Sequence, residues 1–280
     1  MSEPVATVDA HQHYWQFKNF SYSWQAGLDL PAMRLDYMPA AIVPQMQALG
    51  IQYSVLIQAD NSLEETTWML ELARQYSHIA GVVGWVDLAA PDVATTLDEL
   101  AQEPLFKGIR LMPTPIDNWD TLKHGLHALA ERKLTCDLLP DEQSLPAVTE
   151  MIRAHPETRF VVDHLAGLPL IPGSAAPWRE KLRLLAALPH VSLKFSAIQG
   201  LAEPAPINAP TLQPYLDSAL NLFGADRLLF ASDWPVSTLS GAYAECIQVM
   251  REVTVSLSAD EQARIWGGTA IATYGLTLRR

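Results

Sequence analysis

The chain has 280 residues, of which 49% are hydrophobic and 18% charged, and this balance favours a globular protein with a sizeable core over a disordered chain. A formal net charge of -12 and a pI near 5.0 exclude the basic footprint that binding to nucleic acid or to an anionic membrane requires, so small molecules are the expected partners. Residues 1–4 lack the basic and apolar segments of a leader, and no apolar stretch reaches spanning length, which predicts a cytoplasmic protein.

The first predicted strand covers residues 5–13 and ends in His11-Gln12-His13. Alternate side chains of a strand leave the same face, so the two imidazoles point in the same direction and can bind one ligand or ion together. Short histidine patterns also occur on protein surfaces by chance, and the pair alone leaves both interpretations open.

An aromatic segment follows this strand and reaches Leu30-Pro31. Its rings either pack the loop onto the body of the protein, because aromatic side chains dominate packing area, or form the roof of a pocket. The rings belong to Tyr14, Trp15, Phe17, Phe20, Tyr22 and Trp24.

The rest of the chain repeats a unit of one strand followed by one helix. Ser62-Leu63-Glu64-Glu65 has the pattern of a capping box that opens the first of these helices. Ser258-Ala259-Asp260-Glu261 opens the last one, which ends near Gly267-Gly268 and leaves residues 269–276 to pack the C-terminus. The remaining predicted strands cover residues 52–59, 79–88, 106–112, 134–139, 159–165, 191–196 and 227–232. The helices between them cover residues 62–76, 92–100, 119–131, 145–154, 178–188, 211–223 and 243–254.

Eight such units predict an α/β protein, a (β/α)8 TIM barrel in a single domain over residues 1–280. The strands are continuously apolar, which is typical of parallel strands covered by helices. An open, doubly wound sheet is the competing architecture, but no Gly-x-Gly-x-x-Gly turn follows the first strand. Cys136 and Cys246 are too few for a disulfide framework or a thiolate metal site, and we interpret both as core thiols.

Polar and aromatic side chains occupy the C-terminal ends of the predicted strands, where barrels of this kind carry their function. Each has a structural alternative: Arg110 and Asp137 as an ion pair, Asp87 as a turn cap, and Lys194 as a surface lysine with a buried stem. The full ring is His11, His13, Gln58, Trp85, Asp87, Arg110, Asp137, His164, Lys194 and Asp233.

At this point the sequence resembles the amidohydrolase superfamily, and within it the lactonase-like branch of sugar-acid lactonases and 2-pyrone-4,6-dicarboxylate lactonase. The motifs that carry the resemblance span nearly the whole chain. They are Asp9-Ala10-His11-Gln12-His13-Tyr14-Trp15, Gly108-Ile109-Arg110, Asp163-His164-Leu165-Ala166, Lys194-Phe195-Ser196, Ser232-Asp233-Trp234-Pro235 and Gly268-Thr269-Ala270.

The resemblance implies a hydrolase in which His11, His13, His164 and Asp233 line the reaction centre. These four groups could hold one zinc ion with an open position for water. Strand five offers Asp137 where many metal-dependent relatives carry a histidine, and some lactonases of this branch work without metal. We therefore expect one divalent metal that binds but is not strictly required.

For a lactonase, Asp233 is expected to act as general base on water, and the developing oxyanion to be stabilised by zinc or by the three histidines and Arg110. Arg110 and Lys194 suit a substrate that carries a carboxylate or several hydroxyls. Tryptophans could provide flat platforms for a sugar ring, which favours a sugar lactone over a dicarboxylate. The remaining substrate-binding candidates are Trp15, Trp24, Gln58, Trp85, Asp87 and Trp234.

Two other functions stay open. A metal-dependent decarboxylase, or another amidohydrolase that acts on a small carboxylate, would use a similar centre but would need a tightly bound metal. A non-catalytic sugar-acid binder would keep the tryptophans and Arg110 but would have no use for Asp233. The sequence also leaves a homo-oligomer open.

Overall fold

Eight parallel strands form one sheet in the order β1 to β8, which confirms the predicted barrel. The structure is a computed structural model, and it describes residues 5–22, 31–112, 119–196, 208–239 and 241–279. The strands are β1 Val8–Gln12, β2 Tyr53–Ile57, β3 Ile79–Gly84, β4 Phe106–Leu111, β5 Thr135–Leu138, β6 Arg159–Val162, β7 Val191–Phe195 and β8 Leu228–Phe230.

The barrel is closed by short contacts between the ends of β1 and β8. The amide of His13 donates to the carbonyl of Trp234 at 2.7 Å, and the amide of Asp233 donates to the carbonyl of His11 at 3.0 Å. Closure therefore brings the two histidines of β1 beside the carboxylate that follows β8.

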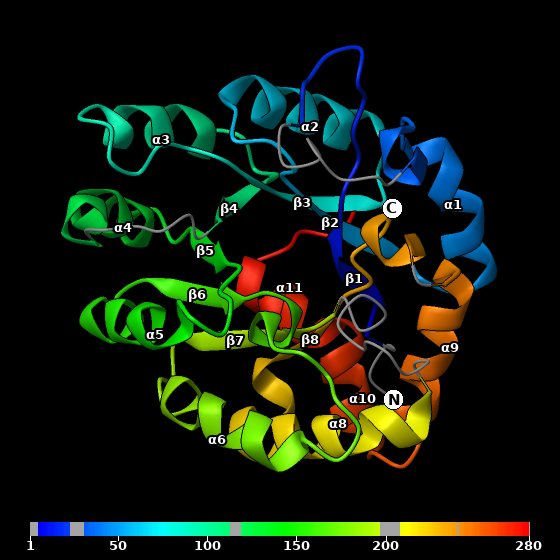
Figure 1. The fold of residues 1–280 in the computed structure, drawn as a ribbon. Coiled ribbons are helices and arrows are strands. Elements are labelled where there is room, and N and C mark those ends of the chain that lie inside the picture. Colours follow the sequence, from blue (N-terminus) through cyan, green and yellow to red (C-terminus); the bar gives the residue numbers. More distant parts are fainter. Residues whose placement is uncertain (1–4, 23–30, 113–118, 197–207, 240, 280) are drawn as a thin grey trace.

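Helices surround the strands as an outer ring (Figure 1). They are α1 Pro39–Ala48, α2 Leu63–Gln75, α3 Val93–Ala101, α4 Lys123–Glu131, α5 Leu145–Ala154, α6 Ala175–Ala186, α8 Ala209–Phe223, α9 Tyr243–Thr254 and α10 Ala259–Ala263. The last helix, α11 Thr269–Tyr274, lies inside this ring (Figure 1). Among the residues that the structure describes, no helix combines the length and the apolar character needed to cross a bilayer.

Helix α1 is absent from the prediction, which placed no element between the aromatic segment and the second strand. Two prolines explain why its pattern is hard to recognise. Pro39 lies in the first turn, where its missing amide costs nothing, but Pro44 lies inside the helix and cannot donate to the preceding turn. Packing of Ile42 and Met46 into the core stabilises the helix in spite of Pro44.

The chain after α10 covers the end of the barrel at which the strands begin, which we call the barrel floor. Ala270 and Tyr274 of α11 belong to the same buried cluster as Val8 and Val55 of the first two strands. The turn before α11 passes β1 so closely that a Cβ atom on Gly267 would lie 1.9 Å from the carbonyl oxygen of Ala6. Residues 269–276, expected only to pack the C-terminus, therefore supply a helix that closes this end of the barrel.

Both cysteines are free and buried, as expected for core thiols.

Candidate active site

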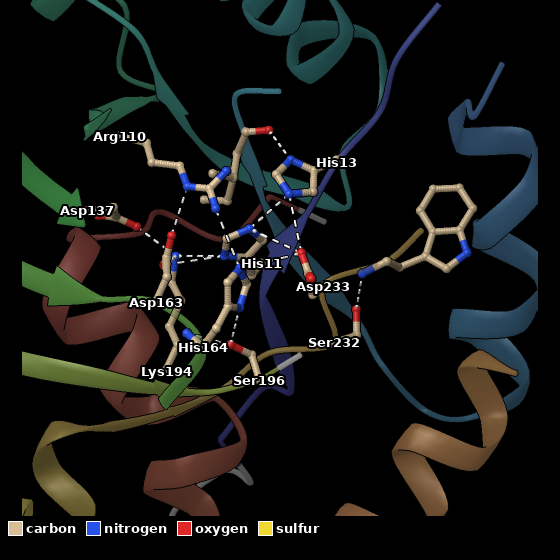
Figure 2. A network of polar contacts seen from close by, with 12 residues as sticks. His11, His13, Arg110, Asp137, Asp163, His164, Lys194, Ser196, Ser232 and Asp233 are labelled. Atoms are coloured by element: carbon tan, nitrogen blue, oxygen red, sulfur yellow. Dashed lines mark hydrogen bonds and ion pairs between the residues drawn. The ribbon is translucent and has the colours of Figure 1, made fainter. Parts of the chain in front are cut away.

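Three imidazoles and one carboxylate converge at the carboxyl end of the barrel (Figure 2). Oδ1 of Asp233 lies 3.3 Å from Nε2 of His13, 3.5 Å from Nε2 of His11 and 3.7 Å from Nε2 of His164. The Nε2 atoms of His11 and His13 are 3.0 Å apart. All four side chains are buried, and among the described residues Oδ1 of Asp233 has no hydrogen-bond partner. This oxygen is therefore available for a proton, a water molecule or a metal ion.

A second carboxylate, that of Asp9, determines where the Asp233 loop lies. Asp9 is fully buried and accepts hydrogen bonds from the amide of Ser232 at 2.8 Å, the hydroxyl of Ser232 at 2.6 Å and the hydroxyl of Tyr243 at 3.2 Å. Ser232 in turn accepts the amide of Trp234 at 3.0 Å. Asp233 lies between these anchored neighbours with a φ of 61°. The anchors hold the left-handed backbone that directs its side chain at the histidines.

His164 lies in a left-handed turn that is unusual for its residue types. Residues 164, 165 and 166 have φ values of 51°, 52° and 64°, although none of them is glycine. Left-handed backbone costs roughly 1–2 kcal/mol for each such residue. The turn is held by Ser196, whose hydroxyl accepts the amide of His164 at 3.2 Å, and by Trp178, whose indole donates to the carbonyl of Leu165 at 3.4 Å.

Hydrogen-bond partners assign the ring protons of His13 and His164. His13 contacts the carbonyl of Ile57 through Nδ1 at 2.9 Å, so Nδ1 carries the proton and Nε2 presents a lone pair. His164 contacts the Ser196 hydroxyl through Nδ1 at 2.8 Å. Nη2 of Arg110, which can only donate, lies 3.5 Å from Nε2 of His164, so Nε2 accepts and the His164 proton lies on Nδ1, which donates to the Ser196 hydroxyl.

Burial lowers the pKa of His11 and of His164, so both rings are neutral near pH 7. Burial alone would raise the pKa of Asp233, but the neighbouring imidazoles of His164, His13 and His11 hold that pKa well below its usual range. Near neutral pH the centre therefore contains an ionised carboxylate beside the neutral imidazoles of His11 and His164, and an ionised carboxylate is the state that a general base requires.

A cluster of buried charges lies on the other side of His11 from Asp233 (Figure 2). Arg110 donates from Nε to Asp163 at 2.9 Å, and Nζ of Lys194 lies 2.7 Å from Asp137 and 2.9 Å from Asp163. Burial would raise the pKa of Asp163, but Lys194, His11 and Arg110 hold it well below the usual range. The structure thus pairs Arg110 with Asp163 instead of Asp137. Lys194 is fully buried, which excludes the alternative of a surface lysine.

The donor atoms of His11, His13 and Asp233 lie within 4.8 Å of one another and could together hold a metal ion. Ligand distances of about 2.0–2.2 Å in a tetrahedral zinc site put neighbouring donors roughly 3.3–3.6 Å apart. The three observed separations of 3.0, 3.3 and 3.5 Å lie close to that range. The same residues also form a hydrogen-bonded group, because the lone pair of His13 can accept a proton from His11.

The remaining predicted residues lie at varying distances from this centre. Trp15 and Trp234 are buried in aromatic packing around Tyr37, which agrees with the packing interpretation of the aromatic segment. Trp85 is half-buried, and Asp87 is exposed and accepts the amide of Ala89, as a turn cap does. Gln58 is fully buried, and its carbonyl oxygen lies 3.5 Å from Nη1 of Arg110. Trp24 lies outside the described residues.

Sequence reasoning missed several residues that support the centre. Asp9, Asp163, Ser196 and Ser232 all lie in the motifs quoted above, and polar residues inside apolar strands are the signal that could have identified them. Tyr274, which donates to Asp137 at 2.6 Å from α11, has no such signal, because its partner is set only by the closed barrel.

Glu65 is another buried carboxylate, and it corrects the predicted capping box at α2. The Ser62 hydroxyl accepts the amide of Glu65 at 2.9 Å, but the Glu65 carboxylate turns away from Ser62. Its Oε2 accepts the amides of Ala59 at 3.0 Å and Asp60 at 2.8 Å in the loop after β2. Of the two reciprocal hydrogen bonds of a capping box, only the one from the Glu65 amide to the Ser62 hydroxyl forms at α2. Both hydrogen bonds form between Ser258 and Glu261.

We expect Glu65→Gln to remove a pH dependence of stability. Burial raises the pKa of Glu65 to about 8, against 4.5 for the exposed group. The folded protein therefore keeps a proton that the unfolded chain loses between these values. The resulting stability is fully present below pH 4.5 and is lost as the pH rises to 8, by on the order of 4 kcal/mol. Urea unfolding of both proteins at pH 5 and pH 8 measures the difference.

The exposed neighbour Glu64 provides a matched control, since Glu64→Gln should leave the pH dependence unchanged. An equal change in the free energy of unfolding between pH 5 and pH 8 in the parent and in Glu65→Gln would show that burial does not shift the pKa of Glu65.

Comparisons with known proteins agree over the full length of the chain. The family model described as Amidohydrolase matches residues 8–276. A protein named L-fucono-1,5-lactonase from Burkholderia ambifaria is 34% identical over 279 residues, covering 95% of this chain and 94% of the relative. A protein of the same name from Burkholderia multivorans is 36% identical over 287 residues, covering 96% of each. The crystal structure of a Burkholderia multivorans amidohydrolase with bound zinc has a TM-score of 0.89 and 34% identity, and it covers 97% of this chain and 100% of that one.

Proposed function

This chain belongs to the amidohydrolase family, and we propose that it is a hydrolase that opens the ester ring of a small sugar lactone of the L-fucono-1,5-lactone class. The observation that carries the proposal is the buried Oδ1 of Asp233, which has no hydrogen-bond partner in the described part of the chain and lies within 3.7 Å of three imidazole Nε2 atoms. An ionised carboxylate in this position can remove a proton from water, and hydrolysis of an ester ring needs that step.

The later steps are stabilisation of the developing oxyanion and protonation of the leaving oxygen, and residues at and around Asp233 carry them out. As water adds to the lactone carbonyl, charge develops on the carbonyl oxygen, which needs preorganised donors. Nη2 of Arg110 lies 3.5 Å from Nε2 of His164, so a guanidinium donor faces the space beside Asp233. When the ring C–O bond breaks, the leaving alkoxide takes a proton, and Asp233 returns the one that it removed from water. Acid and base roles thus alternate on one carboxylate.

The charges of the centre favour an uncharged lactone over a dicarboxylate. The cations of Arg110 and Lys194 are already paired with Asp163 and Asp137, and Asp233 adds a further negative charge. In the described part of the site, an anionic substrate would therefore meet an excess of carboxylates. A sugar lactone carries no charge and offers hydroxyls in its place.

A lactone screen with a pH indicator tests this function. We expect proton release from L-fucono-1,5-lactone and related sugar lactones, and none from 2-pyrone-4,6-dicarboxylate. Hydrolysis of the dicarboxylate alone, or release of carbon dioxide from aromatic acids without any lactone hydrolysis, would reject the proposal in favour of the alternatives.

We expect Arg110→Lys to lower kcat/KM by roughly 10–100-fold while the protein stays folded. A lysine ammonium can replace the charge beside Asp163, but it lacks the second nitrogen that faces His164. Steady-state kinetics and a thermal melt measure the two effects. Arg132→Lys is the control, because Arg132 pairs with exposed Asp98 far along the chain from the site. An unchanged kcat/KM in Arg110→Lys would restrict Arg110 to holding Asp163.

We further propose that the centre can bind zinc without requiring it. Bound zinc would be held by His11, His13 and Asp233, with His164 beside them, and would supply Lewis-acid polarisation and a more acidic water. One contact opposes this binding: Nδ1 of His11 lies 3.2 Å from Nζ of Lys194. If Lys194 donates to Nδ1, the His11 proton lies on Nε2, and that nitrogen cannot be a ligand.

Exhaustive chelation should therefore leave lactone hydrolysis within about threefold of the untreated rate, because Arg110 already supplies a donor to the carbonyl oxygen. Metal analysis before and after chelation, with rates measured on the same samples, is the measurement. Complete loss of activity that stoichiometric zinc restores would show that the metal is essential.

A further inference from the structure

We propose that the ammonium group of Lys194 is a built-in cation that occupies a second metal position of this centre and so limits it to one metal ion. The three atoms around Nζ form the basis of the proposal. Nζ lies 2.7 Å from Oδ2 of Asp137, 2.9 Å from Oδ1 of Asp163 and 3.2 Å from Nδ1 of His11. Two carboxylate oxygens and one imidazole nitrogen are a donor set that divalent metals such as zinc accept.

The contact between Lys194 and Asp163 is an ion pair without hydrogen-bond geometry, since Oδ1 of Asp163 has no hydrogen-bond partner among the described residues. Lys194 thus acts on this oxygen as a point charge and not as a directed donor. All four side chains of the group, including His11 and Asp137, are fully buried. Two carboxylates in such a place need a cation nearby, because an uncompensated buried charge is costly.

The position is fixed from several strands and from the barrel floor. Asp137 lies in β5, Asp163 directly follows β6, and Lys194 lies in β7. The Tyr274 hydroxyl donates to Oδ2 of Asp137 at 2.6 Å, and Nζ of Lys194 lies 5.7 Å from the centre of the Tyr274 ring. The carboxylates therefore cannot easily turn elsewhere if the ammonium is removed.

Zinc stoichiometry tests the proposal independently of the substrate and of lactone hydrolysis. Lys194→Ala removes the ammonium and leaves Asp137, Asp163 and His11 facing the vacated space. After dialysis at a fixed free zinc concentration, we expect no more than one ion per chain in the parent and one additional ion in Lys194→Ala. Zinc should also raise the Tm of Lys194→Ala more than that of the parent.

The double variant Asp137→Asn with Lys194→Ala is the matched control. It removes one charge of each sign and breaks the pair of carboxylates, so it should bind no more zinc than the parent. Equal zinc content in Lys194→Ala and the parent, two ions in the parent, or an extra ion in the double variant would overturn the proposal. Lys194→Ala that folds only with zinc would support it. If Lys194→Ala stays unfolded at every zinc concentration while the double variant folds, a divalent ion cannot replace the ammonium, and the proposal fails.

Discussion

We expect Asp233→Asn to lower turnover by about 10²–10⁴-fold without unfolding the protein, since this is the usual contribution of a general base. Asparagine keeps the size of the side chain but cannot take a proton from water. The backbone anchors at Asp9 and Ser232 do not involve the Asp233 carboxylate, so the loop should keep its place. Turnover of the sugar lactone measures the loss of activity, and the circular dichroism spectrum of the same preparation shows whether the fold is kept.

Asp217→Asn is a suitable control, because Asp217 is exposed on α8, where its carboxylate accepts a hydrogen bond from Gln213 at 2.9 Å. Near-normal turnover in a folded Asp233→Asn variant would remove Asp233 from the base role. The proton acceptor would then have to be sought among the histidines, with His13 first because its Nε2 presents a lone pair.

Asp163→Asn should lower the free energy of unfolding by about 3–5 kcal/mol, which is the usual cost of breaking a buried ion pair. Asp163 compensates Arg110 and Lys194 together, and its own side chain is fully buried. An amide of the same shape would leave those cations with one carboxylate, that of Asp137. Urea unfolding is the measurement, with Asp98→Asn as the control.

Asp98 is 66% exposed in its pair with Arg132, so its replacement should cost less than about 1 kcal/mol. Comparable losses in Asp98→Asn and Asp163→Asn would show that the buried cluster adds little to stability.

The fold and the converging side chains could be predicted because both follow from strand order. Once eight parallel strands close, the residues at their carboxyl ends must face one another, and His11, His13, His164 and Asp233 do. The family resemblance is confirmed by the full-length match.

Which charges pair could not be predicted from the same pattern. Arg110 and Asp137 are direct neighbours in the β4–β5 register, yet Arg110 reaches past β5 to Asp163. Lys194 lies close enough to Asp137 to neutralise it, and only the three-dimensional arrangement reveals this. The hydrogen bonds of Glu65 with the loop after β2, and of Tyr274 with Asp137, likewise depend on how the closed barrel packs.

Because the barrel closes through its first and last strands, the polar centre can form only after almost the whole chain has been synthesised. His13 bonds to Trp234, and Asp137 bonds to Tyr274, so the centre needs residues far along the chain. At a synthesis rate of about 5–20 residues per second, β1 leaves the ribosome roughly 10–40 s before β8 and roughly 13–50 s before α11. During this interval one edge of β1 and its buried polar groups have no native partner. A ribosome stalled before residue 228 would thus hold a chain with an open strand edge, which is the form most prone to pair with another chain or to recruit a chaperone.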